Sequence, residues 1–355
     1  MQRLLAFFRK PKPADVMLAG VVTGAAPAVI AVAGLPLLDI AAHLRSPEGL
    51  PLLSPPALRA WQAPLADEDL RRAADALARH AWLLHLRDAL GPGYRLHETA
   101  EAWVLSPLPD RELLATVAHV RSTRHGVARV LGELARPSAG ERAILLVLDD
   151  QEAYYRYVSG YYPAGEFALS GGMFLNAGVP HFVTPRSELS AVEPTIAHEM
   201  THAALSHLGL PRWIDEGLAV NAEHKLTRSS PHRFTPAQMR AKRDAFWTHD
   251  TIQQFWSGWS FLRGDDGNLL SYDLAQTMVA QLARDWTAFE RFALAAGRDD
   301  GGAAAARDTL DVDLGALACL LLDRDLDVAW QPAPHAWRRP DETRNVATSD
   351  ATDCG

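Results

Sequence analysis

Residues 193–223, EPTIAHEMTHAALSHLGLPRWIDEGLAVNAE, contain the pattern that decides the expected fold and chemistry of this chain. Within this stretch, His198, Glu199 and His202 form H-E-x-x-H. On a helix, residues four apart lie one turn apart on the same face, so both imidazoles can reach one metal ion. Glu199 projects beside such an ion, where its carboxylate can take a proton from a metal-bound water. This arrangement is typical of zinc hydrolases.

The residues around the motif favour the helix that it requires. Pro194 suits the first turn of a helix, and Glu193 suits its positively polarised N-terminal end. Gly209 and Pro211 are expected to end the helix. Good helix formers or apolar packing residues occupy many of the positions between these limits, at Ile196, Ala197, Met200, Ala203, Ala204 and Leu205.

A catalytic zinc usually has three protein ligands, so a third ligand is expected outside the motif. Glu216 can point its carboxylate at the ion if a second, antiparallel helix begins at Trp213. Asp215 is the rival, but on such a helix it points about 100° away and suits a cap or an outer partner of a histidine. His207 lies about 140° around the first helix from His202 and is expected at the surface.

These residues resemble the gluzincin peptidases, in particular the peptidase MA-like domains, which carry HE(L/M)TH and then P-x-W-(L/I)-x-E-G-(L/I)-A. Here H-E-M-T-H is followed after thirteen residues by E-G-L-A, with P-R-W-I-D directly before it. The resemblance implies that His198, His202 and Glu216 bind one zinc ion per chain and that Glu199 is the general base. The thermolysin branch has a longer gap and often an aspartate where Val220 stands, so the outer partner of the histidines is not assigned by the resemblance.

The order of expected elements is that of an α+β fold. Strands are predicted for residues 100–105, 142–148, 167–175 and 181–183, and helices for residues 110–135, 150–158, 273–296 and 310–322. This order also resembles the peptidase MA-like domains over roughly residues 95–300. The resemblance implies a zincin-like domain with a small mixed sheet packed on the active-site helix and a helical C-terminal part. In zincins a strand before the motif helix pairs with an extended peptide, so one of the last two strands is a candidate substrate edge, with a fully paired internal strand as the alternative.

Composition limits the class of protein. The 355 residues, 48% hydrophobic and 22% charged, suffice for one sizeable domain with an appendage or for two domains. The net charge is −8 and no Lys/Arg cluster is interleaved with aromatic residues, which argues against nucleic acid as a partner. The two cysteines, Cys319 in an apolar run and Cys354 at the penultimate position, do not indicate a disulfide framework.

The N-terminal segment is basic and is followed by an uncharged run. Residues 16–38 lack charged side chains over 23 positions, which fits a membrane anchor with an extracytoplasmic domain. A cleaved signal peptide, with its cleavage site at residues 31–33, is the second interpretation and implies a secreted or periplasmic protein. The third is a buried segment of a cytoplasmic protein, because glycines and prolines interrupt the run.

Four parts of the chain are expected. Residues 1–45 are the basic segment with the anchor or signal peptide, and residues 46–93 are a Pro-rich linker followed by an amphipathic helix at 67–90. Residues 94–330 are the zincin-like domain, and residues 331–355 are a disordered tail. Within the domain, residues 227–270 are expected to be loop-rich, with aromatic side chains that cover the zinc helices or line a pocket.

The sequence thus predicts a zinc-dependent metallopeptidase that acts on a peptide or protein substrate. Tyr272 is a candidate hydrogen-bond donor to the oxyanion of the tetrahedral intermediate, as tyrosines are in several gluzincins, and His224 and His232 are further candidates. The alternative is a catalytically inactive zincin-fold protein that serves as a binding or scaffold protein, with membrane association through residues 16–38. Zinc stoichiometry and access of a hydroxamate to the metal distinguish these functions.

Overall fold

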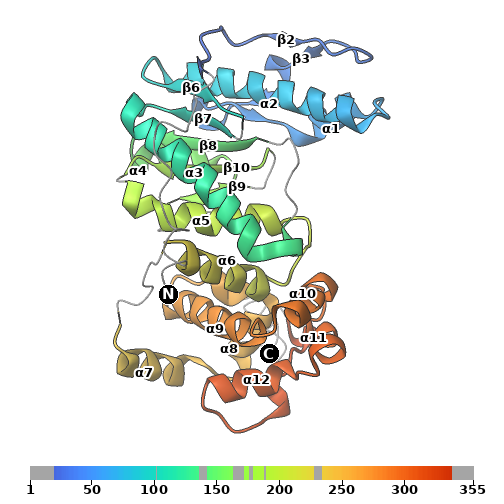
Figure 1. Ribbon diagram of the computed structural model, residues 1–355, viewed down its shortest axis with the longest axis vertical. Helices are drawn as coiled ribbons and strands as arrows, with labels where there is room; N and C mark the ends of the chain where they lie inside the picture. Colours follow the sequence, from blue (N-terminus) through green and yellow to red (C-terminus); the bar gives the residue numbers. More distant parts are fainter. Residues whose placement is uncertain are drawn as a thin grey trace, which may run out of the picture. The chain divides into compact units, whose positions relative to one another are not determined.

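The computed structural model describes residues 20–100, 102–135, 142–162, 172–175, 179–187, 189–227 and 234–337, which form an α+β fold as predicted (Figure 1). The chain divides into two compact units. The first contains residues 1–126 and 137–203, and the second contains residues 127–136 and 204–355. This division differs from the expected boundaries at residues 45, 93 and 330, because the segment 46–93 packs into the same core as the sheet.

A six-stranded mixed sheet forms the centre of the first unit, in the order β1-β6-β7-β8-β10-β9. Its strands are β1 (Gly20–Val21), β6 (Arg95–Glu98), β7 (Ala102–Ser106), β8 (Ala143–Leu148), β9 (Met173–Leu175) and β10 (His181–Pro185). β7, β8 and β10 are parallel, and the other pairs are antiparallel. Parallel neighbours need a crossover connection, and α3 (Asp110–Leu131) lies in the one between β7 and β8.

The two faces of this sheet bury different helices. The other helices of the unit are α1 (Pro55–Gln62), α2 (Glu68–Leu90), α4 (Gln151–Ser159) and α5 (Leu189–Leu205). Trp103 and Leu105 of β7 pack in one core with α2 and α4, whereas Ala102 and Val104 pack in a second core with α3 and Ile196 of α5. Successive side chains of a strand point to opposite faces. α2 and α5 therefore cover opposite faces, and they lie on opposite sides of the strands in Figure 1.

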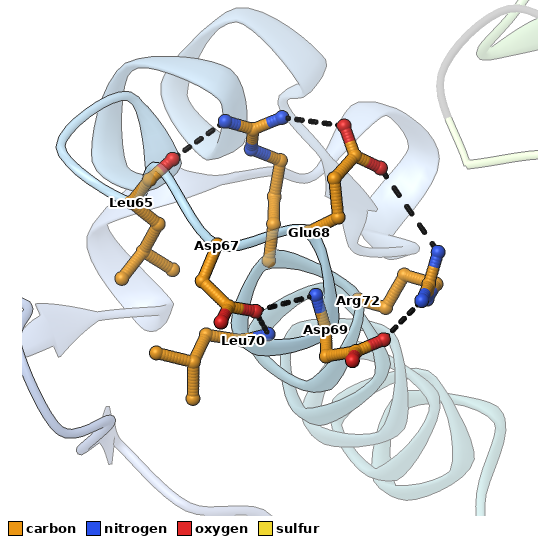
Figure 2. Close-up of polar contacts among 7 residues, drawn as sticks. Leu65, Asp67, Glu68, Asp69, Leu70 and Arg72 are labelled. Atoms are coloured by element: carbon orange, nitrogen blue, oxygen red, sulfur yellow. Dashed lines mark hydrogen bonds and ion pairs between the residues drawn. The ribbon is translucent and has the colours of Figure 1, made fainter.

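α2 confirms the helix predicted for residues 67–90. Its first turn is capped by Asp67, whose Oδ1 accepts hydrogen bonds from the backbone N–H groups of Asp69 at 2.8 Å and Leu70 at 3.0 Å (Figure 2). Such a cap satisfies backbone donors that have no partner within the helix. Gly91 follows the last turn with φ of 106°, a conformation that favours glycine.

Short strands precede α2. β2 (Val29–Ile30) pairs with β3 (Leu38–Asp39), and β4 (Leu44–Arg45) pairs with β5 (Leu52–Leu53). Of the apolar run at residues 16–38, the described part begins at residue 20 and contains strands and turns but no helix. Within the described residues, none of the helices has the length and apolar character needed to cross a bilayer. Membrane anchoring and localisation stay predictions.

The motif helix differs from the expectation at its start. α5 begins at Leu189, so Pro194 lies inside the helix rather than in its first turn. Proline has no N–H to donate to the carbonyl four residues earlier, and its ring crowds that carbonyl. The residues before it nevertheless continue the helix by one more turn.

Strand prediction was incomplete in the first unit. β7, β8 and β10 correspond to three predicted strands, and α3 and α4 to the predicted helices. Only the last three residues of the strand predicted for 167–175 are found in β9, because residues 163–171 lie outside the described part. β1 and β6 were not predicted, since each is short and lacks a run of alternating apolar residues.

The second unit is helical. Its main helices are α6 (Arg212–Thr227), α7 (Pro236–Phe246), α8 (His249–Ser257), α9 (Asp266–Leu282), α10 (Trp286–Ala295), α11 (Ala303–Leu310) and α12 (Leu314–Leu321). α6 and α9 cross so closely that a Cβ at Gly217 would lie 2.5 Å from the carbonyl oxygen of Ala275. Only glycine therefore fits at this crossing without a shift of the backbone.

Several expectations for the second unit were wrong in detail. Residues 234–262 form α7, α8 and a short 3₁₀ helix (Trp259–Leu262) rather than loops. Capping boxes at Thr235 and Thr248 start the two α-helices. The helix predicted for 273–296 begins earlier and is interrupted before α10, where Asp285 caps the new helix. The helix predicted for 310–322 is found as α12, which begins at Leu314, whereas α11 before it was not predicted.

The aromatic residues of this unit are mostly buried. Trp213, Phe255, Trp256 and Phe292 form a chain of ring contacts with centroids 5.0–6.3 Å apart. This packing agrees with the expectation of an aromatic subdomain. The beginning of the predicted tail also packs here, because Gln253 donates a hydrogen bond to the Gln331 carbonyl at 2.7 Å. Residues 338–355 lie outside the described residues.

Candidate metal centre

His198 and His202 lie next to each other on α5, as their spacing predicts. Their Nε2 atoms are 3.1 Å apart, and their rings meet edge to face with centroids 4.8 Å apart. Two nitrogens bound tetrahedrally to zinc at roughly 2.0–2.1 Å lie about 3.3 Å from each other. The observed separation therefore fits a single zinc ion, provided that both rings are neutral and carry their protons on Nδ1.

Packing of α5 fixes the direction in which these histidines point. Ile196, Ala197, Thr201 and Leu205 are fully buried. The Thr201 hydroxyl donates a hydrogen bond to the Ala197 carbonyl at 2.8 Å, so this polar group is satisfied inside the core. Each residue of a helix is rotated by about 100° from the one before it. His198 and His202, which follow the buried Ala197 and Thr201, therefore project from the core. They are only partly buried.

A polar contact also joins α5 to α3 within the first unit. His119 Nδ1 lies 3.5 Å from Glu193 Oε1, and His119 Nε2 lies 3.1 Å from the Thr123 hydroxyl. Glu193 thus contacts a histidine on the neighbouring helix rather than acting as an N-terminal charge of α5. This polar contact joins α3 and α5 in addition to their apolar packing.

Glu199 is held by the edge of the sheet. Its Oε2 accepts a hydrogen bond from the backbone N–H of Phe174 at 2.8 Å. Phe174 lies in β9, the last strand of the described sheet, where it pairs with Phe182 of β10. The N–H of Phe174 therefore orients the carboxylate of Glu199, which follows His198 directly on α5. β10 is an internal strand, so β9 is the remaining candidate for the substrate edge.

Glu216 belongs to α6 in the second unit. Its side chain is 5% exposed, and its Oε1 lies 3.4 Å from Nε of Arg212, one turn earlier on the same helix. Burying a carboxylate is costly unless a positive charge or donors accompany it. Arg212 supplies one such charge. Asp215, the rival ligand, lies in the first turn of α6 and is less buried than Glu216.

Three contacts fix the orientation of α6 in its unit. Trp213 is fully buried, and its Nε1 donates to the Gly301 carbonyl at 2.9 Å. Gly217 lies against α9 at the close crossing described above. One turn later, the Asn221 amide donates to the Gln276 carbonyl at 2.9 Å. These contacts hold α6 in a defined rotation and therefore set the direction of Glu216.

The proposed oxyanion partners lie in different situations. Tyr272 of α9 meets the Phe261 ring edge to face at 5.3 Å. His224 Nδ1 lies 3.2 Å from Nε2 of Gln276. Both residues belong to the second unit, and His232 lies outside the described residues. A role for any of them in catalysis stays a prediction.

Sequence reasoning missed two contributors to the site. The N–H of Phe174 left no signal, because a backbone donor is not marked by residue type. Arg212 could have been found, since it precedes Glu216 by four residues and such a pair shares one helical face.

A metal site made of His198, His202 and Glu216 stays a prediction, because two of these residues belong to the first unit and the third to the second. The chain matches no family model, and comparison with curated proteins and with solved structures finds no similar protein.

Proposed function

We propose that this chain is a zinc-dependent metallopeptidase with a zincin-like fold, in which His198, His202 and Glu216 hold one zinc ion and Glu199 is the general base. The observation that carries the proposal is the pair of imidazole Nε2 atoms 3.1 Å apart, directly beside a glutamate whose carboxylate is oriented by the Phe174 N–H. A histidine pair alone can hold a structural metal. The oriented carboxylate of Glu199 beside the pair adds the general base that hydrolysis requires.

The protein residues have defined tasks in this proposal. When bound, zinc lowers the pKa of a coordinated water to about 7 and polarises the carbonyl of the scissile bond. His198 and His202 each offer an Nε2 lone pair, and Glu216 offers a carboxylate oxygen. Arg212 stays beside Glu216 and stabilises its charged form.

Glu199 moves the proton in both halves of the reaction. Its carboxylate removes a proton from the water that attacks the carbonyl carbon, so a C–O bond forms while the oxygen of the carbonyl becomes negatively charged. The same carboxyl group then gives the proton to the peptide nitrogen as the C–N bond breaks. The products are a carboxylate and an amine. The Phe174 N–H keeps the carboxylate in position during both transfers.

The proposed substrate is a peptide or protein segment in an extended conformation. β9 is the edge strand of the described sheet and lies beside Glu199. An extended peptide can add to such an edge through the main-chain groups that Glu199 does not occupy. A peptide bond of the substrate would then lie near Glu199, whatever side chains the substrate carries.

The test is hydrolysis of a mixed peptide library by the purified full-length chain, followed by mass spectrometry. The proposal predicts cleavage products that disappear after removal of the metal with a chelator and return on addition of zinc. Zinc binding without any cleavage would favour the inactive, zincin-like binding protein instead. In that case a hydroxamate should fail to reach the metal, because the fourth coordination position would be filled from within.

A further inference from the structure

The first unit contains a cavity on the face of the sheet opposite α5. It has a volume of about 430 Å³ and is bounded by the N-terminal half of α2, the last residue of α1, Trp103 of β7 and Arg142. Trp103 belongs to the core shared with α2, whereas α5 packs against the other face. The cavity is therefore separate from the histidine pair. Its size lies in the range that accommodates a small organic molecule.

Positive charge predominates in the lining of this cavity. Four arginines line it, namely Arg71, Arg72, Arg79 and Arg142, together with the two carboxylates of Glu68 and Asp75. Each of the four arginines is already paired with a carboxylate: Arg71 with Glu68, Arg72 with Glu68 and Asp69, Arg79 with Asp75, and Arg142 with Glu98, of which Asp69 and Glu98 do not line the cavity. Guanidinium groups present donors that match carboxylate and phosphate oxygens.

Existing contacts hold these arginines in place without using all their donors. Arg71 donates to the Leu65 carbonyl at 2.5 Å and lies 3.3 Å from Glu68, and Arg72 contacts both Glu68 and Asp69 (Figure 2). Each guanidinium carries five N–H donors in a fixed plane. Groups that are already oriented lose less entropy when a ligand binds.

Arg142 is also held over an aromatic ring. Its guanidinium carbon lies 5.2 Å from the centre of the Trp103 ring, and its Nη1 lies 2.6 Å from Glu98. The side chain is one-third exposed, so a ligand in the cavity can reach it. Arginine stacked on an aromatic ring keeps the edge of its guanidinium open to an anion.

Two buried donors in the lining lack partners. Gln62 is 7% exposed and Trp103 is 4% exposed, and neither the Gln62 amide nitrogen nor the Trp103 indole nitrogen has a hydrogen-bond partner within the described structure. Leaving a buried donor unpaired is unfavourable, so most proteins avoid it. Both nitrogens are donors only, as are the arginines. A ligand that brings acceptor oxygens would supply the partners that the Gln62 and Trp103 nitrogens lack.

We propose that this cavity is a binding site for a small organic anion, held through a carboxylate or phosphate group by Arg71, Arg79 and Arg142 and by the N–H donors of Gln62 and Trp103. The site lies on the far side of the sheet from the proposed catalytic residues. It adds a ligand-binding function that does not depend on the metal or on peptide hydrolysis.

The test is isothermal titration calorimetry of the full-length chain with inorganic phosphate and, separately, with succinate, in chloride buffer of matched ionic strength. Saturable binding of phosphate alone identifies a phosphorylated ligand, and binding of succinate alone identifies a carboxylic acid. Binding of both identifies a general anion site. The proposal is wrong if neither anion gives saturable binding at millimolar concentrations.

Variants locate the binding site. Arg142→Gln removes a charge, and Gln62→Met removes the amide donor while keeping the length of the side chain. Each is expected to weaken binding about tenfold, the usual effect of losing one good hydrogen bond to an anion. Arg111→Gln, an exposed position on α3, is the matched control and should bind as the unaltered chain does. Equal weakening in Arg111→Gln would show that the anion binds through the general charge of the protein, and this result would overturn the proposal.

Two further measurements separate this inference from the proposed function. The melting temperature of each variant without ligand shows whether the variant folds. If Arg142→Gln does not fold, Gln62→Met still tests the binding site. Glu199→Gln should bind the anion with unchanged affinity, because Glu199 lies on α5 across the sheet. Loss of hydrolysis with retained anion binding, or the reverse, would show which of the two proposals fails.

Discussion

The backbone N–H of Phe174 donates a hydrogen bond of 2.8 Å to Oε2 of Glu199, so the edge strand of the sheet orients the glutamate of the H-E-x-x-H motif. These residues are 25 positions apart in the chain and are brought together by the packing of α5 under the sheet. A general base must lie in a fixed position relative to the proton that it takes. The sheet edge thus supplies geometry that the helix alone does not.

Replacing Glu199 by glutamine should abolish hydrolysis and leave metal binding intact. The amide keeps the size of the side chain but cannot accept a proton, and general-base catalysis contributes roughly a hundredfold to ten-thousandfold in rate. The measurement is the initial rate of peptide cleavage together with zinc content. Glu152→Gln, an exposed change on α4, is the control and should have full activity. A fully active Glu199→Gln protein would contradict the mechanism.

Replacing Gly217 by alanine should destabilise the second unit. The new Cβ would lie 2.5 Å from the Ala275 carbonyl oxygen and 2.6 Å from a methyl group of Val279, so α6 and α9 must move apart. Overpacking of this kind costs about 1–3 kcal/mol, which urea denaturation can measure. Gly264→Ala is the control, because a Cβ there meets no atom within 4 Å. Equal stability of the two variants would show that the crossing is looser than described.

The free energy of unfolding should decrease as the pH falls from about 6.5 to about 4, because the native state holds His181 in its neutral form. Burial lowers the pKa of this histidine to about 4, and its Nε2 lies 2.8 Å from the Tyr157 hydroxyl. The unfolded chain therefore takes up the proton first as the pH falls, and the native state loses on the order of 3 kcal/mol over this interval. His80 and His97, whose pKa values are also lowered mainly by burial, act in the same direction.

The measurement for His181 is the free energy of unfolding at several pH values. His181→Gln should lower stability at pH 7 but flatten its dependence on pH, since glutamine does not titrate. Leu175→Ala, which removes a fully buried neighbour in β9, should lower stability by a similar amount at every pH. Parallel curves for the original chain and His181→Gln would refute the assignment.

Breaking the ion pair between Arg243 and Asp273 should be far more destabilising than breaking its neighbour. Arg243 Nε and Nη2 lie 2.7 Å and 2.8 Å from the two carboxylate oxygens of Asp273, whose side chain is 4% exposed. Arg243→Met leaves that charge buried and should cost about 3–5 kcal/mol. Lys242→Met breaks a contact with the half-exposed Asp266 and should cost less than about 1 kcal/mol. Thermal unfolding measures the stability of both variants. Similar losses of stability in Arg243→Met and Lys242→Met would contradict this prediction.

The parts of the fold that depend on local sequence could be predicted. The spacing of His198 and His202 alone places them on one helical face, and their observed contact confirms this. The limits of α2 were readable from Asp67 as a cap and Gly91 as a terminator. In each case the deciding interaction lies within one turn of a helix.

The features that were missed fall into two groups. The hydrogen bond between Phe174 and Glu199 depends on tertiary packing and could not be read from residue types. In contrast, the helices at residues 236–257 were signalled by Thr235 with Gln238 and by Thr248 with Thr251, although residues 227–270 were expected to be loop-rich. Asp285 likewise marked a helix start inside a continuous apolar pattern. The role of Glu216 stays a prediction, since it rests on bringing the two units to one ion.

The zinc content of the purified chain tests the central claim most directly, by elemental mass spectrometry after dialysis against metal-free buffer. The account predicts about one zinc per chain, lost in His202→Ala and reduced in Glu216→Ala but retained in Glu199→Gln, because only the first two remove a ligand. Circular dichroism of each variant excludes unfolding as the cause. No zinc in the original chain, even after reconstitution, or full zinc in His202→Ala, would contradict it.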